Sequence, residues 1–223
     1  MDGAAYAHPD QGEKLVIGID PSLSATAVCP YLVGGSQPEV TLHKASKPDN
    51  TLFGRVERLT DLARRVVDQV EDDAKESGAF LAGIGIEGYS YGSKGASVIT
   101  LGEYGVLLRR GLMMRFPHLC KPHRMWEIAP SKLKKFCAGS GIAKKLQVAL
   151  SLAKRYGVHY ETDDEFDAYG LARMVACMVG AEEPEVKFQR EALCPVAKKP
   201  KPRKSRKKVE VQQELPMTEE PPF

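Results

Sequence analysis

Four carboxylates stand at positions from which they could act on one substrate. Asp20 and Glu87 each end a run of apolar residues, and Asp164 and Asp167 lie three residues apart, so that on a helix they share one face. A set of oxygen ligands without Cys or His suits Mg²⁺ or Mn²⁺ rather than zinc. Two such ions about 3.5–4 Å apart can activate a water and stabilise the leaving oxygen in phosphodiester cleavage.

Two apolar segments must position the first two acids. Residues 15–20 predict a short strand buried on both faces, which ends at Pro21 because proline cannot donate to a sheet ladder. Residues 80–87 predict a second buried strand, whose glycines permit close packing by a helix. The alternative for Asp20 alone is that it opens an Asp-Pro turn.

The other two acids lie in a segment that predicts a helix from Thr162 to about Val179. Thr162 and Glu165 fit an N-terminal capping box, and acids in a first turn suit the helix dipole, which is an alternative reason for residues 163–165. That alternative leaves out Asp167, which begins a mostly apolar stretch where a charge must be compensated. A divalent cation would compensate it.

The rest of the chain alternates strand and helix patterns, which predicts an α/β domain with a mixed β-sheet flanked by helices. Pro30 suits a sheet edge or a bulge, and Ser131 is expected to cap a helix. The expected strands are 25–32, 39–43 and 125–128, and the expected helices are 52–77, 98–114, 131–136 and 143–156. The expected divisions are a flexible N-terminus at 1–13, the domain at 14–183, and a disordered tail at 184–223 with a basic run at 198–208 and an acidic end.

Composition limits the class of protein. The 223 residues suffice for one domain and a tail, and no segment approaches the roughly 18 apolar residues of a membrane span. The five cysteines are odd in number and form no C-x-x-C pair, so we expect reduced thiols. His118, Cys120, His123 and Cys137 fit no common zinc spacing and are expected to be loop and core residues. The net charge is +3, and the run 198–208 alone holds eight Lys or Arg.

Three groups of residues, in order along the chain, resemble one nuclease family. They are Gly18-Ile19-Asp20-Pro21-Ser22 with Thr26, Ile86-Glu87, and Asp164-x-x-Asp167-Ala168. They resemble the RuvC family of Holliday-junction resolvases, over roughly residues 15–179, and Leu101-Gly102 matches a further family pair. The resemblance implies an RNase H-like fold and a metal-dependent endonuclease that cuts four-way DNA junctions. It also implies that Asp20, Glu87, Asp164 and Asp167 are catalytic residues that hold two Mg²⁺ or Mn²⁺ ions per site.

The resemblance extends to a basic segment and a loop. Lys134, Gly139-x-Gly141 and Lys145-x-Gln147-Val148 are similar to the family's segment near the scissile phosphate, which implies that Lys134 and Lys145 bind DNA and that Lys145 is catalytic. Ser90 stands where the family often has a phenylalanine that stacks on a base. Tyr89 or Tyr91 could stack instead, and Lys94 lies on the same loop.

The resemblance also carries expectations about assembly and location. Two symmetry-related cuts need two active sites, which a twofold homodimer supplies. The resemblance allows a phage-type enzyme that cuts junctions, forks and other branches, and bacterial chromosomal and organellar members stay open. The expected location is therefore the cytoplasm of a bacterial or phage-infected cell, with an organelle as the alternative.

Two other functions stay open on the sequence. One is a nuclease of the same fold that acts on RNA–DNA hybrids or single strands, and the other is an inactive DNA-binding module. Four carboxylates argue against inactivity, because clustered negative charge repels phosphates. A DnaQ-type exonuclease would carry Asp-x-Glu on the first strand, where Ser22 occupies the last position.

The tail is expected to work through charge and short peptides. Its basic run predicts salt-dependent, sequence-independent DNA affinity, and a solvated tail without a role is the alternative. The segment from Gln212 to Met217 resembles peptides that bind the bacterial sliding clamp. Residues 219–223 resemble the acidic tip of single-stranded-DNA-binding proteins.

Overall fold

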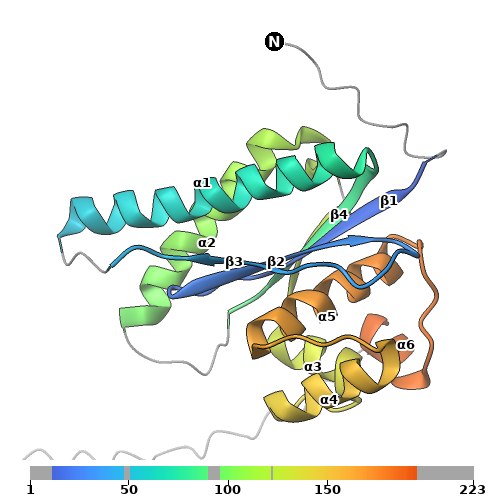
Figure 1. Cartoon of the computed structure of the whole chain (residues 1–223). Coiled ribbons are helices and arrows are strands. Elements are labelled where there is room, and N and C mark those ends of the chain that lie inside the picture. The colour runs from blue at the N-terminus through green and yellow to red at the C-terminus, as the bar shows by residue number, and fades with distance from the viewer. Residues whose placement is uncertain (1–11, 48–50, 90–95, 122, 195–223) are drawn as a thin grey trace, which may run out of the picture.

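A mixed five-stranded sheet forms the centre of the molecule in the computed structural model, which describes residues 12–47, 51–89, 96–121 and 123–194 (Figure 1). The strand order is β3-β2-β1-β4-β5, with β1 and β4 paired in parallel in the middle. β2 pairs antiparallel with β1 and β3, and β5 pairs parallel with β4. The strands are β1 (Lys14–Asp20), β2 (Ala25–Leu32), β3 (Thr41–Lys44), β4 (Phe80–Glu87) and β5 (Met125–Ile128).

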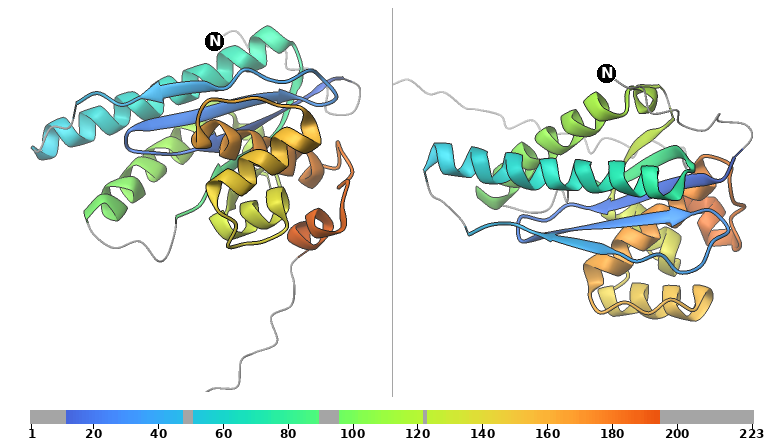
Figure 2. Two further views of the ribbon diagram at one scale, coloured as in Figure 1. Left: turned by 60° about the horizontal axis from the view of Figure 1, so that its bottom comes forward. Right: turned by 45° about the horizontal axis from the view of Figure 1, so that its top comes forward.

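Helices cover both faces of this sheet, so the predicted α/β class with a flanked mixed sheet is confirmed (Figures 1 and 2). One face carries α1 (Leu52–Ser77) and α2 (Ala96–Arg115), followed by the short 3₁₀ helix η1 (Pro117–Cys120). The opposite face carries α3 (Pro130–Ala138), α4 (Lys145–Tyr156), α5 (Asp163–Met178) and α6 (Lys187–Leu193). Within the described ranges, no helix has the length and apolarity that a membrane crossing needs.

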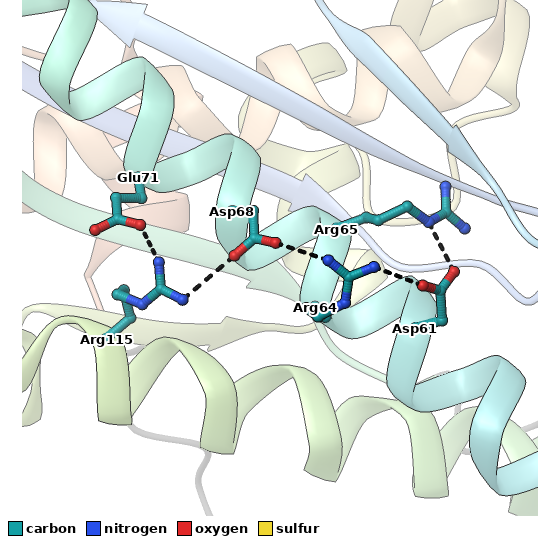
Figure 3. A network of polar contacts seen from close by, with 6 residues as sticks. All are labelled: Asp61, Arg64, Arg65, Asp68, Glu71 and Arg115. Carbon is teal, nitrogen blue, oxygen red and sulfur yellow. Dashed lines mark hydrogen bonds and ion pairs between the residues drawn. The ribbon is translucent and has the colours of Figure 1, made fainter.

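Helix α1 begins and ends where its sequence predicts. The hydroxyl of Thr51 accepts a hydrogen bond from the amide of Gly54 at 3.0 Å, and Gly78 ends the helix with a φ of 62°. Polar side chains then join α1 to α2 (Figure 3). Arg115 of α2 forms ion pairs with Glu71 and Asp68 of α1, and these pairs are partly exposed. They therefore contribute mainly to the register of the two helices rather than to stability.

Helix α5 packs directly on the central strands because those strands carry glycines. A Cβ atom at Gly85 of β4 would lie 2.6 Å from Val175 Cγ2, and one at Gly83 would lie 3.1 Å from Val175 Cγ1. The glycines of this strand therefore allow the close helix packing that the sequence predicts. Pro30 also lies as predicted, at a sheet edge, because β3 pairs only with Ala25–Val28 of β2.

Two details differ from expectation. Ser131 is not a cap: α3 begins at Pro130, with Ala129 as the capping position and no side-chain hydrogen bond, because proline is favoured at the first helical position. The second difference is α6, which lies inside the range 184–223 that we assigned to a tail. The ring of Phe188 packs over Gly139 at the end of α3, so the folded part continues beyond residue 183. All five cysteines are free thiols.

Candidate active site

Asp20 and Glu87 lie side by side at one edge of the sheet. Because β1 and β4 are parallel and Ile19 pairs with Ile86, both acids leave their strands at the same level. Asp20 is only 7% exposed. Burial, and then the charge of Glu87 and a hydrogen bond with it, raise the pKa of Asp20 far above its ordinary value. Two carboxyl groups joined by a hydrogen bond share one proton, so the pair titrates as a unit.

Helix α5 brings the third acid against this pair. Thr162 caps the helix by accepting from the amide of Glu165, whose carboxylate accepts from the Thr162 amide at 2.6 Å, so the predicted capping box is present. Asp167 follows one turn into the helix and is 8% exposed. Burial, and then the charge of Asp20, raise the pKa of Asp167 to about 7. The charge of Asp164 also raises the pKa values of Asp20 and Asp167.

The two predicted lysines approach the acids from α3 and α4. Lys145 Nζ lies 3.6 Å from Asp163 Oδ2 and 3.8 Å from Asp164 Oδ1. Burial disfavours the charged lysine, but the acids outweigh it and raise the pKa of Lys145. The charge of Lys134 lowers the pKa of Glu87 and of Asp167 against the larger effect of burial, which places this lysine within electrostatic reach of both.

These acids offer suitable donor atoms for a metal ion, but their side chains are not arranged as a metal site. Their oxygen donors and uncompensated negative charge match a hard divalent cation. Yet among the described residues, no three His, Cys, Asp or Glu side chains form a group that could hold a metal ion. Asp164 instead pairs with Lys145. Binding of an ion at this site would therefore require rotation of at least one carboxylate.

The buried hydroxyl groups of Thr26 and Tyr104 stabilise the turn that follows Asp20. Thr26 Oγ1 lies 2.8 Å from the hydroxyl of Tyr104 on α2 and donates to the carbonyl of Ser22 at 3.3 Å. The turn is thereby tied to β2 and to α2. In the sequence Thr26 stands out only as part of a motif, and no local pattern points to Tyr104.

Tyr89, which we predicted to stack on a DNA base, is held against α2. Its hydroxyl accepts a hydrogen bond from Arg109 Nη1 at 3.0 Å, and the guanidinium also lies over its ring at 5.1 Å. Arg109 Nη2 donates to Glu127 Oε2 at 2.7 Å. Stacking by Tyr89 remains a prediction that requires these contacts to open. Tyr91 and Lys94 lie outside the described residues.

Two contributors to the site were missed or misassigned from the sequence. Asp163 was explained as a first-turn acid, but it also forms the shorter of the two ion pairs to Lys145. Gly18 was noted only as part of a motif, although its backbone contacts α5 directly. No local sequence pattern could have predicted the ion pair of Asp163, because its partner Lys145 lies on another helix.

Comparisons with known proteins bear on the fold. No model of a known protein family matches the sequence, and no curated protein matches it. Among solved structures, Thermus thermophilus RuvC is 17% identical with a TM-score of 0.52, and the match covers 75% of this chain and 95% of that one. The same protein in complex with a Holliday junction substrate is 18% identical with a TM-score of 0.51, covering 75% and 92%. The chain therefore has a RuvC-like fold.

Proposed function

From a RuvC-like fold whose central strands end in neighbouring acids, we propose that this protein is a metal-dependent endonuclease that resolves Holliday junctions and cuts other branched DNA. The observation that carries the proposal is the cluster of Asp20, Glu87 and Asp167 next to two lysines: all three acids have raised pKa values, and Asp20 and Asp167 are buried. Burying repelling charges costs stability, which a purely structural role does not explain. The structure of T. thermophilus RuvC with a Holliday junction substrate supports the substrate class by analogy of fold.

The residues have separate roles in this proposal. Asp20, Glu87, Asp164 and Asp167 would hold two Mg²⁺ or Mn²⁺ ions, which supply a hydroxide nucleophile and neutralise charge on the leaving oxygen. Lys145 would exchange its ion pairs with Asp163 and Asp164 for a contact with the scissile phosphate, and Lys134 would approach the same phosphate from α3. Both lysines then stabilise the additional negative charge that develops in the transition state.

The proposal extends to assembly and partners. Two symmetric cuts across a junction require two sites, so we expect a homodimer. The segment from Gln212 to Met217, which lies outside the described residues, is proposed to bind a sliding clamp. Full-length protein should then bind purified clamp, and a Leu215→Ala variant should not, because the apolar anchor carries much of a short peptide's affinity.

One cleavage assay tests the activity. Full-length protein with Mg²⁺ or Mn²⁺ is given equal amounts of a four-way junction, a fork, linear duplex, single-stranded DNA and an RNA–DNA hybrid. We expect cleavage of the junction and fork, and its loss in the Asp20→Asn variant. Cleavage confined to the hybrid or the single strand would favour the other nuclease function. Binding of DNA without cleavage of any substrate would favour the inactive module.

A further inference from the structure

Helix α4 and the turn before it expose an apolar face. Leu146 and Leu150 lie four residues apart on one side of α4 and are 67% and 60% exposed, and Ile142, in the turn before the helix, is 92% exposed. The opposite side of α4 already supplies Val148 and Leu152 to the core. The exposed residues, called here the α4 stripe, are therefore additional to what the helix needs for folding.

The segment that carries the α4 stripe is rich in cations, of which Lys135 and Lys145 form ion pairs with acids of α6 and α5. Residues 130–156, which comprise α3, the turn and α4, contain no Asp or Glu. Seven cations lie in that range: Lys132, Lys134, Lys135, Lys144, Lys145, Lys154 and Arg155. A surface that combines positive charge with exposed aliphatic side chains is complementary to an anion that also offers apolar faces. A nucleic acid with unstacked bases has both properties.

The position of the stripe relates it to the acids. Lys145, whose amine lies 3.6 Å from Asp163, directly precedes Leu146 in the first turn of α4 and follows Ile142 by three residues, so both stripe residues are close along the chain to a lysine of the site. Helix α4 lies beside α5 on the face of the sheet opposite α1 (Figure 2). A DNA strand held at the acids would therefore pass the N-terminal end of α4.

We propose that Ile142 and Leu146 form an apolar wedge that packs against unstacked bases at a DNA branch point. The inference rests on the proposed function and adds a means of recognising the branch. Aliphatic wedges of this kind can separate base steps, because they replace the base stacking contact that is lost. Three aliphatic side chains are too few for a stable protein interface, which needs about 1,200 Å² or more, so a small apolar target beside phosphates fits better.

The wedge is tested by base fluorescence, which does not depend on cleavage. A four-way junction carries 2-aminopurine at the branch point, and full-length protein is added without divalent metal. We expect wild type to raise the fluorescence by unstacking the base, and an Ile142→Ser/Leu146→Ser variant to lose most of that rise. Its affinity for linear duplex should stay within about twofold, because phosphate contacts remain.

A matched control is available on the other face of the sheet. Met114 of α2 is 70% exposed, so Met114→Ser removes a similar apolar surface away from the acids, and we expect it to leave the fluorescence rise intact. An unchanged rise in the double variant would overturn the wedge, as would an equal loss in the control. A double variant that unstacks the junction normally but fails to bind an acidic protein would assign the stripe to a protein partner instead. If wild type unstacks the branch but cuts no DNA, the proposed function fails while the wedge stands.

Discussion

Gly18 of β1 and Ala168 of α5 are in backbone contact. A Cβ atom at Gly18 would overlap the carbonyl oxygen of Ala168 and would lie 2.6 Å from the amide nitrogen of Ala172. Asp20 follows Gly18 by two residues, and Asp167 immediately precedes Ala168. The contact therefore sets how closely the strand and the helix bring their acids together.

The first prediction concerns this contact. Gly18→Ala should lower the free energy of unfolding by about 3 kcal/mol, because α5 must move away from the sheet. Cleavage should fall even at temperatures where the protein remains folded, since Asp167 moves with the helix. Thermal unfolding and junction cleavage measure the two effects. Gly102→Ala is the control: outside its own helix, a Cβ there meets none of the described residues within 4 Å, and alanine in a helix should be neutral or stabilising.

The second prediction concerns the acids. Asp20→Asn, Glu87→Gln and Asp167→Asn should each reduce cleavage at least about 100-fold, because each removes charge that would hold a metal ion. Junction binding in a gel-shift assay should persist, since negative charge beside the phosphates is also removed. If one of the three variants cuts at near wild-type rate, the residue that it replaces does not hold a metal ion.

Lys134→Ala and Lys145→Ala should reduce cleavage more than binding. The reason is that the proposed contact strengthens as charge develops on the phosphate. Single-turnover rates and equilibrium affinities over a range of salt separate the two effects. Lys154→Ala, near the C-terminal end of α4, provides the comparison. A loss of binding that matches the loss of rate, with a smaller salt slope, would make either lysine a positioning contact.

A fourth prediction concerns pH and a group away from the site. Burial raises the pKa of Asp73 on α1 from 3.8 to about 6, and its Oδ2 atom has no hydrogen-bond partner among the described residues. For an acid with a raised pKa, the stabilising contribution is complete below the unfolded value and is lost as the pH rises through the folded value. Asp73→Asn should therefore gain stability over wild type as the pH rises from 3.8 through about 6.

The size of that gain is about 1 kcal/mol after allowance for the partial exposure of Asp73. Gln69, which donates to Asp73 Oδ1 at 2.8 Å, can donate equally to an asparagine. Chemical denaturation of both proteins at several pH values measures the difference, and the other shifted acids cancel in it. A difference that does not change with pH would show that Asp73 is not the titrating group.

The fifth prediction separates the tail from the domain. A protein that ends at Ala197 should fold and keep its cleavage at low salt, and should lose activity at physiological salt because the basic run 198–208 is absent. A protein that ends at Ala181 also lacks α6, whose Gln189 is buried and donates to Tyr156 at 2.8 Å. It should be less stable by about 2 kcal/mol or more. Equal melting temperatures for the two would remove α6 from the folded domain.

The sequence by itself determined the elements, because their signals are local. Alternation of apolar residues, Thr51 and Gly78 at the ends of α1, and the capping box of Thr162 each act within a few residues. Asp20 and Glu87 could be grouped in advance because each ends an apolar strand, whereas the parallel pairing of β1 with β4, which puts the two acids at the same level, was decided by the fold. The glycines of β4 likewise predicted that a helix packs closely against this strand.

Only the tertiary structure decided how the charges meet. Three contacts join segments that are separate in the chain. They are the ion pair of Lys145 with Asp163, the backbone contact of Gly18 with Ala168 and the hydrogen bond from Arg109 to Tyr89. Their energies depend on distance and burial, which no sequence spacing encodes. The exposure of Ile142 and Leu146 is of the same kind, because an apolar side chain is expected to be buried until the position of its helix is known.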